Sequence, residues 1–463
     1  MKKLSFVFDW IGPSGPLRNG VIPDIVELAL AHDHQLTFKN TPNRPPLNHN
    51  LYHSFLRYGI VHEIIPTYSI TQHESYSDIV LQKKSYLYEL TTTECINLER
   101  LFNDYSGIFS NYDDTFVSKE LLERVRLLLV RIVISHPYES FLSDEILLRM
   151  HRYFEKLKIP LSQVIYATSC INGQAVYLDF CQRHNLPNHL NCEFIPTYWL
   201  DLRVHHTHPT VSKHLYPNGY SYSSTYTPGP RNKDFVCFNR RYRDHRILFG
   251  LLLHKRNLLD KCFFSMDKTR PESGQSFIEF VHQGAAYEAN YCADSLDKLK
   301  ISHDIINSFD AMLPIVVDTD NFNGILSTQI NDTVLDAFND SLVHIISETN
   351  FFSPIVHMTE KTLKPVVYLQ PFIMLGSANS LRCLRELGFK TFSDFWDESY
   401  DVEIDSVLRL KKIIKLCETI SSWSQQKKLQ FTYDVKEIVE YNYNHFLHGD
   451  IPALNDWMEK YGN

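Results

Sequence analysis

Short apolar runs alternate with amphipathic segments through the second half of the chain. The runs FVCFN (235–239), LVHIISE (342–348) and PFIML (371–375) are rich in β-branched and aromatic residues and predict buried strands. The segments RDHRILFGLLLHKRN (243–257) and ANSLRCLRELG (378–388) carry apolar residues at helical spacing and predict helices. Strands that alternate with helices predict a mostly parallel sheet covered on both faces.

The first half has the same pattern, interrupted by a longer helical stretch. Three apolar runs predict early strands: Leu4–Phe8, QLTFK (35–39) and IVHEIIPTY (60–68). Helical spacing then dominates residues 91–158, including SKELLERVRLLLVRIVISH (118–136) and a helix that begins near Ser143. After residue 160 the α/β pattern returns. This predicts an N-terminal α/β domain with a helical insertion over about 91–158.

Chain length and local composition predict where the domains begin and end. The chain has 463 residues, too many for one hydrophobic core, so two domains are expected. Pro, Gly, Ser and Tyr are enriched between 207 and 233, which predicts a linker and a surface loop. We therefore expect an N-terminal domain over 1–232, a second domain over 233–404, and a helical tail over 405–463 that crosses back to the first domain.

Charge and cysteine content argue against several classes of protein. The net charge of −8 argues against a broad nucleic-acid footprint, although a local basic patch remains compatible with it. Nine cysteines occur without a C-x-x-C pair, which argues against a zinc site and against a disulfide scaffold. The sequence has no apolar run long enough for a membrane span or a signal-peptide core. A cytoplasmic location is expected.

The segment HMTEKTLKPVVYLQPFIMLGS (357–377) contains the clearest candidate site. Thr359 is a good N-cap for a helix that we expect to break at Pro365, and Glu360 and Lys361 follow it. Free N–H groups and the helix dipole favour an anion there, Lys361 suits a phosphate, and Glu360 suits a ribose hydroxyl pair. The alternative is a favourable first-turn acid beside a solvated lysine.

These residues carry a resemblance to a known family. The run LVHIISETNFFSPIVHMTEKTLKPVVYLQPFIMLGS (342–377) resembles the donor-binding segment of the α1,3-fucosyltransferases, which are GT-B glycosyltransferases. Exostosin-like transferases share the layout, and residues 235–401 are similar to uncharacterised phage and bacterial GT-B-like proteins. The resemblance implies two Rossmann-like lobes facing a cleft. It also implies that Glu348, Glu360 and Lys361 bind the donor nucleotide. Glu-Thr-Asn replaces the family's Glu-Asn-Ser, so the resemblance does not identify the transferred sugar.

A second constellation, CFNRRYRDHR (237–246), follows the first strand of the second domain. Its donor-binding candidates are Asn239, Arg240, Arg243 and Arg246. Guanidinium groups form bidentate hydrogen bonds with phosphate oxygens and neutralise the charge of a leaving diphosphate. The alternative, a solvated basic helix start, is disfavoured because cations oppose the dipole at that end. The fucosyltransferases also use an arginine after this strand, and Arg240 or Arg243 is the best match.

The remaining candidates are weaker. Asp9 follows the first strand at the edge of a Gly-rich turn and could act as the general base, or simply cap the loop. His205, His206 and His208 lack zinc-site spacing and are interpreted as a surface loop. The pair Asp318 and Asp320 is interpreted as a turn rather than a cation-binding Asp-x-Asp motif. We expect no metal site. The acidic stretch 397–401 is expected near the donor.

The sequence therefore predicts a metal-independent glycosyltransferase. It would move a sugar from a nucleotide-diphosphate sugar to an acceptor hydroxyl, with inversion by resemblance and without a further cofactor. The acceptor, whether glycan, protein or nucleic acid, is open. Two alternatives remain: a catalytically silent GT-B-like protein that binds nucleotide or glycan, and a phage-type glycosyltransferase that acts on DNA bases.

Overall fold

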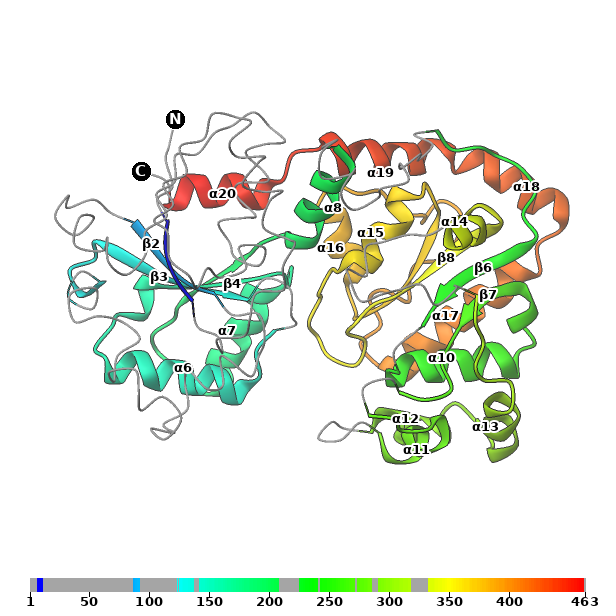
Figure 1. The fold of residues 1–463 in the computed structure, drawn as a ribbon, viewed down its shortest axis with the longest axis horizontal. Coiled ribbons are helices and arrows are strands. Elements are labelled where there is room, and N and C mark those ends of the chain that lie inside the picture. The colour runs from blue at the N-terminus through cyan, green and yellow to red at the C-terminus, as the bar shows by residue number, and fades with distance from the viewer. Residues whose placement is uncertain are drawn as a thin grey trace, which may run out of the picture. The chain divides into compact units, whose positions relative to one another are not determined.

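The protein divides into two compact units. The computed structural model describes residues 6–10, 86–91, 123, 125–136, 141–207, 225–239, 242–270, 273–284, 290–317 and 332–461. Unit 1 combines Met1–Gly219 with Ile451–Asn463, and unit 2 is Tyr220–Asp450 (Figure 1). The division falls at 219/220, before the expected boundary at 232. The tail expected as one segment, 405–463, is shared between the two units.

Unit 1 contains a five-stranded parallel sheet. Its strands are β1 (Phe6–Trp10), β2 (Tyr86–Thr91), β3 (Val130–His136), β4 (Val164–Thr168) and β5 (Asn191–Phe194). They pair in the order β1-β2-β3-β4-β5, and every pair is parallel. The order does not reverse anywhere in this described sheet, so it has no topological switch point of the kind that binds ligands in open parallel sheets.

Helices of unit 1 lie on both sides of this sheet. They are α6 (Asp144–Lys156), α7 (Gly173–Arg183), α8 (Thr197–Thr207) and α20 (Pro452–Tyr461), with a 3₁₀ turn at Leu161–Gln163. Figure 1 shows α6 and α7 on one side and α20 on the other. The predicted N-cap of α6 is confirmed, because the Ser143 hydroxyl accepts a hydrogen bond from the Ile146 N–H (3.4 Å). The C-terminal helix α20 is held by Glu193, whose carboxylate binds the hydroxyl of Tyr461 (2.6 Å) and the ammonium of Lys460.

One predicted helix is wrong in its second half. The segment 118–136 was expected to be helical throughout, but Val130–His136 is strand β3 at the centre of the sheet. Leu128 has a φ of 62°, which ends the preceding turn before the strand begins. Val130 and Ile132–Ile134 are almost completely buried, and their β-branched side chains suit a strand with neighbours on both edges. The expected strands at 35–39 and 60–68 lie outside the described residues.

Unit 2 contains a four-stranded parallel sheet whose order reverses. Its strands are β6 (Lys233–Phe238), β7 (Cys262–Ser265), β8 (Ser341–Ser347) and β9 (Phe372–Leu375). They pair in the order β7-β6-β8-β9, all parallel. The predicted strands and the α/β architecture with parallel sheets are confirmed here. From β6 the chain moves first to β7 on one side and later to β8 on the other, so a switch point lies between β6 and β8.

Helices cover both faces of the second sheet. They are α10 (Asp244–Lys255), α11 (Phe277–Gln283), α12 (Tyr291–Leu296), α13 (His303–Asp310), α14 (Asp332–Asn339), α15 (Glu360–Val367), α16 (Ser380–Glu386), α17 (Ser406–Ser421), α18 (Gln425–Asp434) and α19 (Lys436–His448), with a 3₁₀ turn at Leu259–Lys261. Figure 1 shows α10 and α17 on one side of the sheet and α15 and α19 on the other. The helix α15 was expected to break at Pro365. Instead, Pro365 lies inside the helix, which continues to Val367. Across the described residues, no helix is both long and apolar enough to cross a membrane.

Candidate functional site

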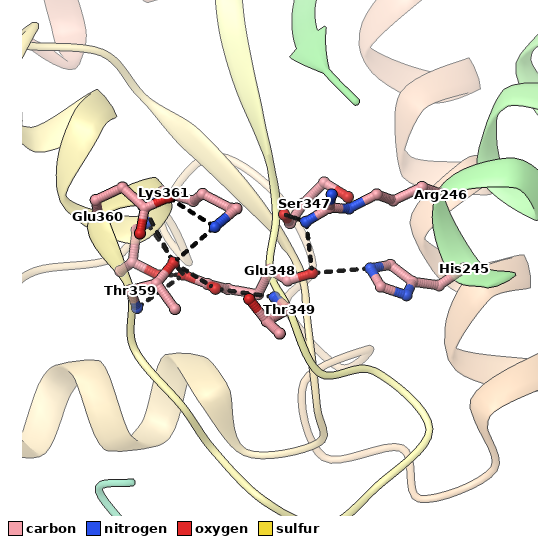
Figure 2. A network of polar contacts seen from close by, with 9 residues as sticks. His245, Arg246, Ser347, Glu348, Thr349, Thr359, Glu360 and Lys361 are labelled. Carbon is pink, nitrogen blue, oxygen red and sulfur yellow. Dashed lines mark hydrogen bonds and ion pairs between the residues drawn. The ribbon is translucent and has the colours of Figure 1, made fainter. Parts of the chain in front are cut away.

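The candidate site lies at the carboxyl ends of β6 and β8, on either side of the switch point. Asn239 follows β6, and Ser347 is the last residue of β8. The helices that leave these ends, α10 and α15, both begin at this edge of the sheet. Figure 2 shows Lys361 and Arg246 directed toward the end of β8 from opposite sides. The two motifs picked out in the sequence therefore lie together in space.

Glu348 joins the end of β8 to the start of α15. Its buried carboxylate accepts hydrogen bonds at Oε1 from the backbone N–H groups of Thr359 (3.2 Å) and Thr362 (3.1 Å) and from the Thr362 hydroxyl (2.5 Å). Oε2 accepts from the Thr349 N–H (3.0 Å) and the Thr359 hydroxyl (2.8 Å). A carboxylate at the positive end of the helix dipole is favourable, so Glu348 fixes the first turn of α15 in place.

This contact corrects one part of the sequence interpretation. The first-turn N–H groups of α15 were expected to be free for a phosphate. Instead, Glu348 binds the N–H groups of Thr359 and Thr362, and the Thr359 hydroxyl accepts from the Lys361 N–H (3.2 Å). Thr359 is the N-cap, as predicted. The anion at this helix end is thus the protein's own carboxylate, and Glu348 acts as a positioning residue.

Glu360 and Lys361 form a fixed ion pair at the start of α15. Glu360 Oε1 lies 2.7 Å from Lys361 Nζ, and that ammonium lies 3.3 Å from the Thr359 hydroxyl oxygen. Burial of Glu360 opposes its charge, but the ammonium groups of Lys361 and Lys364 outweigh this and hold the pKa of Glu360 at about 2. The Lys361 side chain keeps 30% exposure, so its positive charge is held in position but can still reach a ligand.

Arg246 and His245 secure the other side of the β8 end. The Arg246 guanidinium donates to the carbonyl oxygens of Ser347 (3.1 Å) and Glu348 (3.4 Å), and His245 Nε2 lies 2.9 Å from the Glu348 carbonyl oxygen (Figure 2). Burial lowers the pKa of His245 well below its ordinary value, so the ring is neutral and donates from Nε2. Burial also lowers the pKa of Arg246 to about 10. Arg246, predicted to bind the donor, thus binds backbone carbonyls in this structure.

Arg243 is the described arginine of this cluster that is available to a ligand. It is the N-cap residue of α10 and is half-buried. Its positive charge is close enough to Arg246 and His245 to lower the pKa of both groups. Its guanidinium has no hydrogen-bond or ion-pair partner within the part of the chain that the structure describes. A cation held beside the Arg246 guanidinium, without a counter-ion among the described residues, favours an anionic ligand. Arg240, the other candidate, lies outside the described residues.

Buried polar atoms without partners collect at the same edge. Asn239 donates through Nδ2 to Cys237 Sγ (3.2 Å), but its Oδ1 has no partner among the described residues, and neither do Ser347 Oγ and Ser377 Oγ. All three residues are at least 96% buried, and they end or follow the neighbouring strands β6, β8 and β9. Leaving a buried polar atom unpaired costs about 1–3 kcal/mol, so such a cluster is typical of a functional edge.

The acidic stretch 397–401 has a structural role. Asp401 accepts hydrogen bonds from the N–H groups of Leu381 (2.8 Å) and Arg382 (3.0 Å), which caps α16. Glu398 accepts from the Phe392 N–H (2.8 Å) and from Arg385 (3.0 Å). Both carboxylates are therefore used to hold the segment around α16. Their expected place near the donor has no support in these contacts.

Arg409 is a buried arginine that was not among the sequence candidates. It connects the site to the C-terminal tail. Arg409, on α17, donates to the carbonyl oxygens of Gly376 (3.1 Å), Glu403 (2.6 Å) and Phe351. Its guanidinium carbon also lies 4.4 Å from the centre of the Phe351 ring. Arg409 thereby joins the end of β9 to the loop after β8. Arg409 shares helical spacing with Ile413 and Leu416, so its position on the apolar face of α17 was the available signal.

Several predicted residues cannot be placed in the site. Asp9 lies in β1 and its backbone pairs with Leu90, while its side chain is outside the described part of the chain. His205 and His206 lie in α8 without described side chains, and His208, Asp318 and Asp320 are outside the described residues. Among the described residues, no group of three His, Cys, Asp or Glu side chains could hold a metal ion.

A cavity of about 280 Å³ lies at the opposite edge of the second sheet. Its lining includes Lys233, Asp234 and Lys428. Lys428 is ion-paired with Asp234, which also accepts from the Ser421 hydroxyl (2.8 Å), and Lys233 donates to the Asp260 carbonyl oxygen. These charges have partners within the protein, whereas Arg243 at the carboxyl edge has none among the described residues, so this cavity is the poorer candidate.

Two comparisons with known proteins give no relative. The chain matches no protein-family model and no curated protein. The candidate site of unit 2 is consequently defined by its own geometry: a switch point, a fixed ammonium at Lys361 and, at Arg243, a guanidinium with no partner among the described residues.

Proposed function

We propose that the protein is a glycosyltransferase whose unit 2 binds a nucleotide-diphosphate sugar at the carboxyl ends of β6 and β8. One observation carries this proposal: Lys361 and Arg243 present positive charge at the edge where the strand order reverses. In open parallel sheets this edge is where ligands bind. A diphosphate is the part of such a donor that needs two cations.

The proposed reaction is a displacement at the anomeric carbon. The acceptor hydroxyl attacks that carbon, the bond to the diphosphate oxygen breaks, and the nucleoside diphosphate leaves with the electron pair. Lys361 and Arg243 stabilise the charge that develops on the leaving group. A carboxylate takes the hydroxyl proton, and Asp9 is the candidate base from the sequence. Inversion and a GT-B arrangement of the two units belong to this proposal.

A silent nucleotide-binding protein is the second candidate, and one observation favours it. Both carboxylates at the described site are engaged, Glu348 with the start of α15 and Glu360 with Lys361. Neither is free to act as a base. Binding of a nucleotide sugar without any turnover or hydrolysis would select this alternative over the transferase.

A thermal-shift screen tests the proposal directly. UDP-, GDP-, CMP- and dTDP-sugars should be compared with inorganic pyrophosphate. A ligand at about one hundred times its dissociation constant stabilises the native state by about 2.7 kcal/mol, which raises the melting temperature. We expect one nucleotide-diphosphate sugar to raise it, followed by release of nucleoside diphosphate on incubation. If no nucleotide or pyrophosphate shifts the transition, the proposed donor site is wrong.

Removing the cations should weaken that binding. Lys361→Ala and Arg243→Ala are each expected to reduce nucleotide-diphosphate affinity by about tenfold to a hundredfold, because a hydrogen bond to a charged group is worth about 1.5–3 kcal/mol. Calorimetric titration measures the change. Lys415→Ala is the matched control, since Lys415 is 75% exposed on α17. Affinities equal to that of the control would place the phosphates elsewhere.

A further inference from the structure

A pair of stacked aromatic rings lies at the surface of unit 2. The rings of Tyr291 and Phe352 are 4.4 Å apart between centroids, and their planes differ by only 5°. Tyr291 is the first residue of α12, and Phe352 lies in the loop between β8 and α15. Tyr291 is 42% exposed, so part of its ring is open to a ligand. Since one of its faces packs on Phe352, the exposed part of the ring offers a flat platform.

This platform is anchored in the core of the site. Phe352 meets Phe351 edge to face (5.2 Å, 80°) and lies 6.5 Å from the His245 ring. Phe351 in turn stacks on His245 (5.3 Å, 15°) and lies under the Arg409 guanidinium. His245 also binds the Glu348 carbonyl oxygen at the end of β8. The exposed ring is thus held by the same residues that fix the candidate site.

The helix that carries Tyr291 is joined to the helix start that carries Arg243. Asp244 Oδ1 accepts a hydrogen bond from the Cys292 N–H (3.3 Å), which joins the first turn of α10 to the first turn of α12. Arg243 precedes Asp244 and Tyr291 precedes Cys292, so both are adjacent to this contact. The Arg243 guanidinium has no partner among the residues that the structure describes. An anion at Arg243 and a flat ring on Tyr291 could therefore belong to one ligand.

We propose that Tyr291, supported by Phe352, stacks the nucleobase of the bound nucleotide. The inference rests on the proposed function and adds the residue that would recognise the base. Every nucleobase has a π-face, and stacking on an aromatic side chain is worth about 1–3 kcal/mol per base. A nucleotide joins such a base to phosphates, which matches an aromatic platform on a helix joined to the helix start that carries Arg243. A sugar ring lying on Tyr291 is the competing outcome.

Titration of three ligands tests the inference. The nucleoside diphosphate and the nucleotide sugar selected by thermal shift are compared with inorganic pyrophosphate, for the wild type, Tyr291→Ala and Tyr291→Phe. Tyr291→Ala should weaken both nucleotide ligands about tenfold and leave pyrophosphate unchanged. Tyr291→Phe keeps the ring and should bind like the wild type. Tyr433→Ala, at a tyrosine that is 57% exposed on α18, is the matched control.

Each contrary result has a separate meaning. If Tyr291→Ala loses the same affinity for all three ligands, or loses none, the stacking role is wrong while the proposed donor site stands. Loss confined to the nucleotide sugar assigns the ring to the sugar and overturns the inference as stated. A wild type that binds pyrophosphate but no nucleotide overturns the inference and the proposed function together.

Discussion

Replacing Glu348 with alanine is expected to lower the free energy of unfolding of unit 2 by about 3–5 kcal/mol. The substitution removes the acceptor of the Thr359 N–H and of the Thr359 and Thr362 hydroxyls, all on residues that are 1% exposed. The Thr362 N–H loses one of two acceptors and keeps the Thr359 carbonyl oxygen (3.2 Å). Each unpaired buried donor costs about 1–3 kcal/mol. Because folded domains are stable by only about 5–15 kcal/mol, this loss is a large part of the total.

Urea unfolding measures the loss, and hydrogen exchange of the peptide 359–367 locates it. The amide of Thr359 should exchange faster than in the wild type, since Glu348 is its acceptor. The amide of Thr362 should change less, because it also donates to the Thr359 carbonyl oxygen. Glu386→Ala is the control: it removes a glutamate that is 56% exposed and should change stability by less than about 0.5 kcal/mol. If the two variants were equally stable, Glu348 would have no positioning role.

Acid is expected to remove a stabilising contribution of Glu360. Its pKa falls from the ordinary 4.5 to about 2 in the folded protein, mainly through Lys361 and Lys364 acting against burial. A depressed carboxyl pKa stabilises the folded state fully above pH 4.5, and the contribution disappears as the pH falls toward 2. A shift of this size corresponds to about 3 kcal/mol.

The difference in unfolding free energy between the wild type and Glu360→Gln isolates this contribution. It should shrink by about 3 kcal/mol as the pH is lowered from 6 to 2.5. Asp401→Asn provides a comparison of opposite sign, because burial raises the pKa of Asp401 and its contribution falls as the pH rises. A difference that stays constant with pH would mean that Glu360 is not held as a buried anion.

The second sheet was predictable because its strands are continuous apolar runs. Ser341–Ser347 is buried at every position, and so is Phe372–Leu375, as expected for parallel strands covered on both faces. The same argument failed at Val130–His136. There the apolar positions of a preceding helical turn run into the strand without a polar break, so spacing alone could not separate them.

The helix start at the candidate site was predictable, but the contacts of its residues within the protein were not. A threonine cap followed by Glu360 and Lys361 after an apolar run fixed the helix start correctly. The acceptor of that helix, Glu348, is separated from Thr359 by a loop whose path depends on Phe351 and Arg409. Local spacing does not encode such a contact. Arg246 was likewise selected as a phosphate ligand, whereas its burial directs it to the backbone of β8.

The division of the chain has a consequence for the order of synthesis. Helix α20 belongs to unit 1, where Lys460 and Tyr461 bind Glu193, although all of unit 2 precedes it in the sequence. A ribosome therefore finishes unit 2 while unit 1 still lacks this helix, and domains generally fold as units as they emerge. We expect a chain arrested near residue 450 to hold a folded unit 2 beside an incomplete unit 1.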